Sequence, residues 1–388
     1  MELSDAIPDF LAAQRESAAD DEQAVFLQLE DLWERKLWHE LTEVLVEFFE
    51  SDASAPHRIP LYEHFIANFA GKINQLRLVQ LGLRASDMCK DDRERLTFVN
   101  RLASKVDKPA SQDAFVYATV ASAGILLKLD EHDEARAKLD ACERVLDGFD
   151  SVETIVHASF YKTNADYYRV TSDFAAYYRT ALLYLACVDN LDADLAPQER
   201  AERAYNLAIA ALASDRIYNF GELLLHPILN SLTGADAPQD NQWLRDLLFA
   251  FNRGDLRAFD ALSNNIGAHP LLGQRTGFLR EKMCLAALTE AVFKRPPAQR
   301  ALTFSAISDE TSVSEKDIEH LVMRALSLGL VRGTIDQVAQ VARIQWVQPK
   351  VLDMGQIESM RGRLREWDGS VNALGTWIEG VGRDVWAA

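Results

Sequence analysis

The feature that most constrains this chain is the spacing of its apolar residues, which recur every three or four positions through about the first 290 residues. That spacing is the period of an α-helix, whereas the period-2 alternation of a half-buried strand is missing there. The segment from Asp21 to Ser51 is the first clear case. It has two apolar stripes, made by Phe26, Leu29, Trp33, Leu37, Leu41, Val44 and Phe48, and by Leu32, Trp38, Leu45 and Phe49. Such a broad apolar surface indicates a helix with neighbours on two sides.

Short breaks separate the later helical segments. Beyond the helix pattern that resumes at Leu61, one helix starts at Lys108–Ser111 and runs through Leu129, and a second follows the turn Asp130–Asp133 and ends at about Leu146. The next predicted helices are Val152–Val170, Ser172–Val188, Pro197–Ala213 and Arg216–Leu232. Helices joined by short turns lie antiparallel. Helical hairpins that repeat every 35–40 residues or so indicate a right-handed solenoid of the tetratricopeptide type. The fold class is therefore mainly α.

The clearest hairpin is rich in aromatic residues. It runs from Phe160 to Tyr168 and from Asp173 to Leu182, with the small residues Ala165, Ala175 and Ala181 at points of close helix approach. We interpret its aromatic side chains as core packing between hairpins rather than as a ligand cage.

The pattern changes after the segment Lys294-Arg295-Pro296-Pro297, which is a strong helix stop. The residues beyond it predict a strand (Ala301–Phe304), a helix (Ser305–Thr311), a second helix (Glu315–Leu328), and two strands (Leu330–Ile335 and Val341–Val347). Ser314 suits the N-cap of the second helix, and Gly329 suits its C′ position. We expect Ile344 and Trp346 to share one face of the last strand. This order of elements is that of a winged helix.

Charge argues against nucleic-acid binding by this winged helix. The chain has a formal net charge of -18, and residues 299–352 carry six basic and six acidic side chains. The would-be recognition helix begins with Glu315, Asp317 and Glu319, so it would bring carboxylates toward phosphates. The same acidity disfavours an anionic membrane surface.

The last segment carries an uninterrupted apolar heptad seam. Its spacing of three and four residues predicts a helix that packs along partner helices. The predicted partner-interface residues are Ile357, Met360, Leu364, Trp367, Val371, Leu374 and Ile378, and Val381 and Val385 continue the seam. Six glycines between Gly355 and Gly382 weaken the helix by about 1 kcal/mol each. We interpret the tail as a segment that orders fully on assembly; the alternative is a helix folded back on its own winged helix.

No spacing of catalytic residues is found in the sequence. HExxH, GxxxxGK and GxSxG motifs are missing, and the eight histidines are scattered. We therefore expect no catalytic residue, no cofactor and no metal. The cysteines Cys89, Cys142, Cys187 and Cys284 each lie in an apolar helical stretch and fit buried free thiols in a reducing compartment. The first residues lack the basic start of an export signal, and no apolar run reaches the ~18 residues of a membrane span.

Helical repeats followed by a winged helix are the arrangement of the PCI domain. Within that group the chain resembles the 26S proteasome non-ATPase regulatory subunit 13 family. The segments that carry the resemblance are Tyr167–Tyr168, Asp173–Arg179, Phe251–Leu256, Glu319–Leu330, Arg332–Val338 and Trp346–Pro349. The resemblance implies a non-catalytic scaffold of the regulatory particle lid in ATP- and ubiquitin-dependent protein degradation. It also implies partners among the other lid PCI subunits and the lid helical bundle, in cytoplasm and nucleus.

The expected domains are N-terminal repeats (1–170), the helical part of the PCI domain (171–297), the winged helix (298–352) and a C-terminal assembly helix (353–388). Three alternatives stay open on the sequence. One is a PCI subunit of the signalosome or of a translation initiation factor complex. The others are a winged-helix nucleic-acid adaptor and an enzyme with an unrecognised site. No small-molecule substrate, nucleic acid or membrane is expected as a partner.

Overall fold

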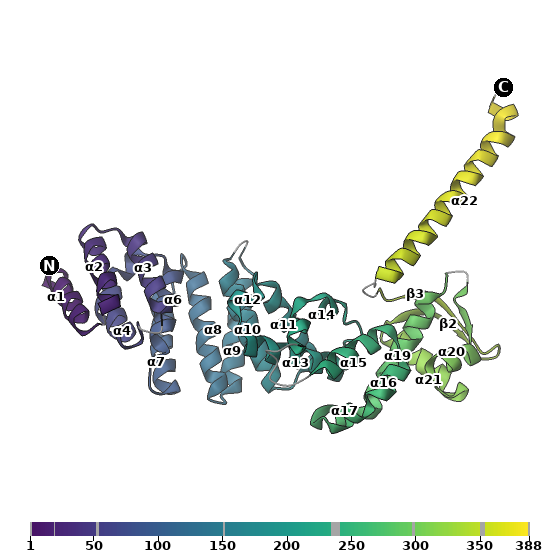
Figure 1. Ribbon diagram of the computed structural model, residues 1–388, viewed down its shortest axis with the longest axis horizontal. Helices are drawn as coiled ribbons and strands as arrows, with labels where there is room; N and C mark the ends of the chain where they lie inside the picture. Colours follow the sequence, from purple (N-terminus) through teal and green to yellow (C-terminus); the bar gives the residue numbers. More distant parts are fainter. Residues whose placement is uncertain are drawn as a thin grey trace. The chain divides into compact units, whose positions relative to one another are not determined.

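The structure is a computed structural model that describes residues 2–18, 20–51, 54–149, 152–233, 241–296, 299–349 and 354–386. The chain forms two compact units, Met1–Ala196 and Pro197–Ala388 (Figure 1). The predicted domain boundaries at 297/298 and 352/353 fall on residues outside the described ranges. The boundary at 170/171 stays a prediction.

The N-terminal unit is a stack of helices. Its α-helices are α1 (Glu2–Ser17), α2 (Asp20–Glu34), α3 (Trp38–Glu50), α4 (Ala55–Pro60), α5 (Ala67–Phe69), α6 (Gln75–Ser86), α7 (Asp92–Val106), α8 (Gln112–Lys128), α9 (His132–Leu146), α10 (Thr154–Val170), α11 (Phe174–Ala186) and α12 (Leu191–Asp194). A π-helical turn, η2 (Leu61–Ile66), and a 3₁₀ turn, η3 (Ala70–Lys72), lie between α4 and α6. Helix α8 packs against α7 and α9, and also against α6 and α10. This pattern of near neighbours confirms a helical-repeat array (Figure 1).

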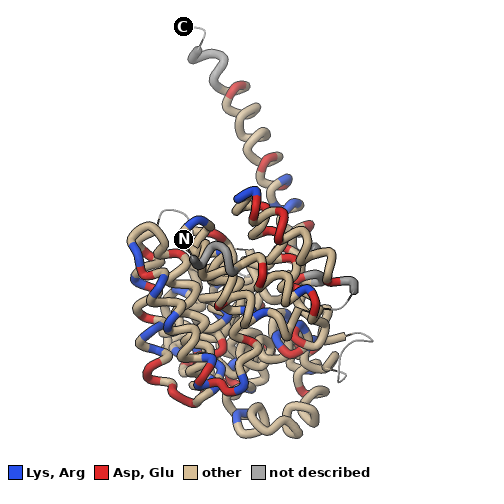
Figure 2. The backbone as a smooth tube through the Cα atoms, turned by 90° about the vertical axis from the view of Figure 1, so that its left-hand side faces the viewer, with Lys and Arg blue, Asp and Glu red and all other residues tan. Residues whose placement is uncertain are grey.

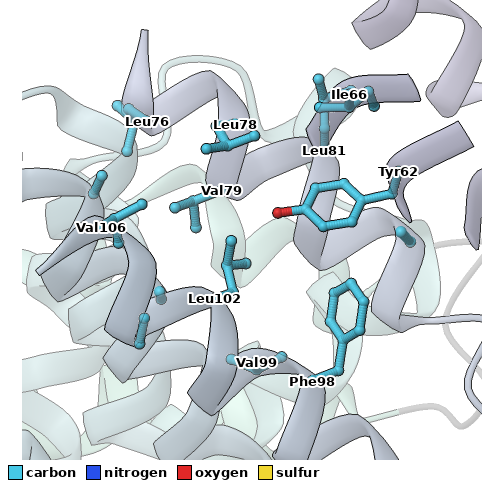
Figure 3. Close-up of a cluster of buried hydrophobic side chains, with 14 of the residues drawn as sticks. Tyr62, Ile66, Leu76, Leu78, Val79, Leu81, Phe98, Val99, Leu102 and Val106 are labelled. Atoms are coloured by element: carbon cyan, nitrogen blue, oxygen red, sulfur yellow. The ribbon is translucent and has the colours of Figure 1, made fainter. Parts of the chain in front are cut away.

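The core of this unit lies between successive helices. Tyr62 of η2 points toward Phe98 and Leu102 of α7, beside the apolar side chains of α6 (Figure 3). The rings of Tyr62 and Phe98 are 5.3 Å apart between centroids. The aromatic hairpin is core packing, as predicted: Phe160, Tyr177 and Tyr178 are buried.

Two predictions for this unit need correction. The segment from Asp21 to Ser51 is two helices, α2 and α3, rather than one. The chain breaks at Lys36, whose φ of 59° lies in the left-handed region and cannot continue a right-handed helix. The prediction of buried thiols is wrong for Cys89 and Cys187, which are half-buried; Cys142 of this unit and Cys284 of the second unit are buried, and all four thiols are free.

The second unit begins with a further set of helices. They are α13 (Pro197–Ala213), α14 (Gly221–Leu225), the 3₁₀ helix η4 (Pro227–Leu232), α15 (Gln242–Arg253), α16 (Leu256–Ala261), α17 (Ser263–Ala268), α18 (Pro270–Gly273) and α19 (Thr276–Lys294). The single helix predicted over Arg216–Leu232 is wrong. His226 is extended there, since the residue before a proline is pushed out of the helical region.

Two close contacts fix α19 within this unit. Gly254 ends α15 with a φ of +67°, and a Cβ at this position would lie 2.8 Å from the Cα of Ala287 in α19. The ammonium of the buried Lys282 donates hydrogen bonds to the carbonyl oxygens of Ala211, Leu212 and Ser214, at 2.7, 3.2 and 2.8 Å. These carbonyls end α13 and have no partner within the helix. Burial lowers the pKa of Lys282 to about 7, and the charge of Asp215 acts in the opposite direction.

The winged helix has the predicted order. It consists of β1 (Ala301–Thr303), α20 (Phe304–Thr311), α21 (Glu315–Ser327), β2 (Val331–Asp336) and β3 (Val341–Val347), and its antiparallel sheet has the order β1-β3-β2. Gly329 ends α21 with a φ of +71°, as its predicted C′ role requires. Two details differ. Ser314 occupies the N-cap position without a capping hydrogen bond from its side chain. Ile344 is buried, but Trp346 is 36% exposed.

The last element is α22 (Met354–Trp386), one continuous helix of 33 residues. That the tail orders fully only on assembly stays a prediction. Gly362, Gly369, Gly375 and Gly380 all lie within the helix, and a Cβ added at any of them would meet no atom within 4 Å beyond the helix's own nearby backbone. A long helix tolerates them because propagation adds a hydrogen bond at every residue.

Candidate assembly surface

Helix α22 presents the predicted seam on its surface. The seven predicted interface residues, Ile357 to Ile378, are between 44% and 68% exposed, and Val381 is 61% exposed. Their heptad spacing on one continuous helix places them along one face. The alternative, a helix folded back on the winged helix, is wrong, since the described side chains of α22 are exposed. The side chain of Val385 lies outside the described residues.

The free energy of burying this exposed face indicates its role. Full burial of one Val, Leu, Ile or Met side chain stabilises by about 1.5–3 kcal/mol, whereas one glycine within a helix costs about 1 kcal/mol. Burying the seam therefore outweighs the loss from the glycines. An exposed apolar stripe of this length is typical of a surface that binds another helix.

Sequence reasoning missed one residue of this surface. Trp377 is 63% exposed and directly precedes Ile378, so it widens the apolar face on one side of the seam. Tryptophan is enriched among the residues that dominate binding energy. The signal that could have found it is its position next to the seam, which a strict three-and-four spacing ignores.

The side chains of the winged helix are poorly suited to bind the phosphate backbone of a nucleic acid. Arg324 of α21 forms an ion pair with Glu281 of α19 at 2.7 Å, and the guanidinium of Arg332 lies 4.7 Å from the ring centroid of Trp346. The first turn of α21 is acidic. In Figure 2, basic and acidic positions are interspersed along the helices. The sheet leaves one edge of β1 and one of β2 unpaired, which suits the addition of a protein strand.

Chemical sites are not apparent in the described chain. No group of three or more His, Cys, Asp or Glu that could hold a metal is found among the described residues. Burial raises the pKa of Cys142 to about 12 and raises the pKa of Cys284, so both thiols stay protonated and weakly nucleophilic. Among the described residues, no helix is long and apolar enough to cross a membrane.

Helical repeats, a winged helix without a basic face and an exposed heptad helix define a PCI protein of the scaffold type. Comparison with known families supports each part. Residues 25–248 match the PSD13 N-terminal repeats, residues 252–346 match the PCI domain, and residues 350–382 match the Rpn9 C-terminal helix.

Curated relatives match over almost the whole chain. The probable 26S proteasome regulatory subunit rpn9 of Schizosaccharomyces pombe is 43% identical over 99% of both chains. The 26S proteasome regulatory subunit RPN9 of Saccharomyces cerevisiae is 38% identical over 98% of both. The 26S proteasome non-ATPase regulatory subunit 13 homolog B of Arabidopsis thaliana is 33% identical over 93% of this chain and 94% of its own. The chain belongs to the family of 26S proteasome non-ATPase regulatory subunit 13, also called Rpn9.

Proposed function

We propose that this protein is a non-catalytic structural subunit of the lid of the 26S proteasome regulatory particle, where it supports lid assembly and ATP- and ubiquitin-dependent protein degradation. The single observation that carries the proposal is the exposed apolar seam of α22. Its residues gain free energy when another helix covers them. The names of the relatives supply the complex.

The partners we propose are the other PCI subunits of the lid and the lid helical bundle. The interface consists of Ile357, Met360, Leu364, Trp367, Val371, Leu374 and Ile378, to which the structure adds Trp377. The winged helix contributes protein contacts through its sheet edges. No small-molecule substrate, nucleic acid or membrane takes part. We place the protein in cytoplasm and nucleus, and retain the four-part domain division with its boundary at 170/171.

Truncation tests this proposal. A chain that ends at residue 353 loses α22 and keeps both the helical stack and the winged helix, whose cores do not use α22. We expect the truncated chain to fold, as judged by circular dichroism and thermal unfolding. We expect its co-purification with proteasome subunits from its own cells to fall sharply. The proposal would be contradicted if the truncated chain assembled as well as the full chain.

The rival PCI complexes are less favoured, since the relatives that match over nearly the full length carry proteasome names. Co-purification with signalosome or initiation-factor subunits, in place of proteasome subunits, would reverse that order. The nucleic-acid adaptor is disfavoured by the acidic first turn of α21 and by the ion pair of Arg324.

A further inference from the structure

A second surface lies in the N-terminal unit and goes beyond the proposed role of α22. Helices α3, α6, α7 and α8 and the start of α10 enclose a cavity of about 350 Å³. A neighbouring cavity of about 280 Å³ lies against α3 and the segment before α6. Arg77 of α6 lines both cavities, so they meet at its side chain. The larger volume is within the usual range for ligand pockets.

Part of the larger cavity is apolar. Val46 of α3 and Leu83 of α6 line it and are half-buried, whereas Phe49 and Leu81 lie deeper and are each 1% exposed. Ile155, at the start of α10, is 39% exposed at its margin. An apolar side chain from a partner can be buried against these groups.

Hydrogen-bond donors line the same cavity. Arg77 and Arg84 lie seven residues apart on α6, so about two helical turns, or some 10 Å, separate them along one face. Arg77 donates to the amide oxygen of Gln80 at 2.9 Å and to no carboxylate in the described chain. The guanidinium of Arg84 forms no hydrogen bond or ion pair with another described residue. Its charge acts on Tyr117 of α8, where it opposes the rise in the pKa of the phenol that burial causes.

The acidic groups of the cavity do not pair with these two arginines. Asp87 forms its ion pair with Arg95 of α7. Glu50 is the other acidic residue of the lining. The smaller cavity shares Arg77 and adds Lys72, which stacks on Trp38 at 4.4 Å, with Glu43 and Glu153. The two linings together are therefore balanced in charge, and the donors available to a ligand are the guanidinium groups of Arg77 and Arg84, which form no ion pair with a described residue.

We propose that this cavity is a docking site for an acidic peptide segment of a partner protein. Aspartate or glutamate side chains of the segment bind between Arg77 and Arg84, with the Tyr117 hydroxyl as a further donor. An apolar side chain next to them packs on Val46 and Ile155. Arginine pairs with carboxylates through charge-assisted, often bidentate hydrogen bonds, which give specificity as well as affinity. A nucleic acid is disfavoured because the rest of the chain repels a polyanion.

Binding of defined peptides to the full chain tests the site. The probes are fluorescein-labelled nonapeptides with amidated C-termini that combine Asp or Glu with one Leu or Phe. The comparison set has Asn and Gln in place of the acids. We expect fluorescence anisotropy to show binding of acidic members of the set, at least about tenfold weaker binding of their amide counterparts, and weakening by added salt.

Substitutions of the two arginines test whether the peptide binds at this cavity. Arg77→Gln with Arg84→Gln should weaken the best acidic peptide by about tenfold or more. Arg93→Gln with Arg144→Gln removes the same charge from two exposed positions of the same unit and should leave binding unchanged. The chain that ends at residue 353 should bind the peptide like the full chain, which separates this test from the test of α22. The proposal is overturned if no peptide binds at about 1 mM, if amide peptides bind equally well, or if both pairs of variants have the same effect.

Discussion

Helices α8 and α22 are both rich in apolar residues but differ completely in burial. Helix α8 buries nine of its 17 residues between α6, α7, α9 and α10. Helix α22 is about twice as long, and its apolar seam is exposed from Ile357 to Val381. The apolar pattern of a helix thus indicates which residues gain free energy on burial, but it does not specify whether the neighbour that buries them belongs to the same chain.

The contrast also separates two uses of apolar area. Burial in α8 contributes to the folding of the N-terminal unit itself. Burial of the seam of α22 contributes to association, where it must offset the entropy lost when two molecules combine. A substitution in α8 should therefore change folding, whereas a substitution in α22 should change assembly.

The largest expected effect is on the free energy of unfolding of the N-terminal unit. Leu126→Ala removes a side chain of α8 that is 1% exposed, so it should lower this free energy by about 2–5 kcal/mol. Leu374→Ala, at a position of α22 that is 55% exposed, should change the stability of the isolated chain by less than about 0.5 kcal/mol. Urea unfolding followed by circular dichroism measures both. Similar losses in the two variants would remove the distinction between the helices.

The buried Lys282 tests the contrast between buried and exposed residues in the second unit. Lys282→Met keeps much of the side-chain volume but removes the donor for three carbonyl oxygens at the end of α13. An unsatisfied buried group costs about 1–3 kcal/mol, so we expect a loss of that order in the free energy of unfolding. The matched control is Lys316→Met on the exposed side of α21. Equal stability of the two variants would show that α19 does not depend on this contact.

The sequence predicted most of this architecture because the signals were local. Nearly every element of the winged helix was predicted, because its signals act within a few residues: the helix stop after Lys294, the apolar stripe of α21 and Gly329. The heptad seam was predicted for the same reason. The domain boundary at 170/171 and the interface role of the seam stay predictions.

The features that the sequence did not predict are not encoded in a local pattern of residues. The left-handed conformation of Lys36 splits α2 from α3, and lysine is an uncommon residue for it. Lys282 looks like any amphipathic helix residue until α13 places three carbonyl oxygens around it. The cavity beside Arg77 needs residues from five helices, so its donors could not be grouped from the sequence.

Two His-Pro pairs in the second unit predict that its free energy of unfolding depends on pH. Helix α22 contains no histidine and should not contribute to this dependence. His226 and His269 each accept backbone N–H bonds at Nδ1, from Ile228 and from Leu271 and Leu272, at 3.2–3.3 Å. Burial lowers the pKa of both histidines, so the folded state favours the neutral form. Their contribution is fully present above the unfolded pKa of about 6.5 and is lost as pH falls below it toward the lower folded pKa.

Asparagine tests this prediction, because it caps a helix without titrating. With His226→Asn and His269→Asn, the free energy of unfolding should fall less between about pH 7.5 and 5 than in the unaltered chain. Urea unfolding at each pH gives the slopes. Parallel slopes would show that the two caps do not sense protonation.

The smallest effect is expected from the charges of α22. Glu358 and Arg361 form an exposed pair at 2.5 Å, and Glu366 lies away from the seam. Exposed ion pairs contribute about 0–1 kcal/mol, so changing these three residues to Gln should alter neither folding nor assembly appreciably. Thermal unfolding and co-purification are the measurements. A marked loss of assembly in this variant would place the interface on the polar face.

The most direct test of the account is whether the apolar seam of α22 carries assembly. Leu364→Ala with Leu374→Ala removes two side chains from the middle of the seam, and each costs about 2–5 kcal/mol if its site in the complex is well packed. The tagged variant should fold like the unaltered chain and lose most of its co-purifying proteasome subunits, while the Gln variant of the charged residues keeps them. Retention of partners by the Leu variant together with their loss in the Gln variant would contradict the account.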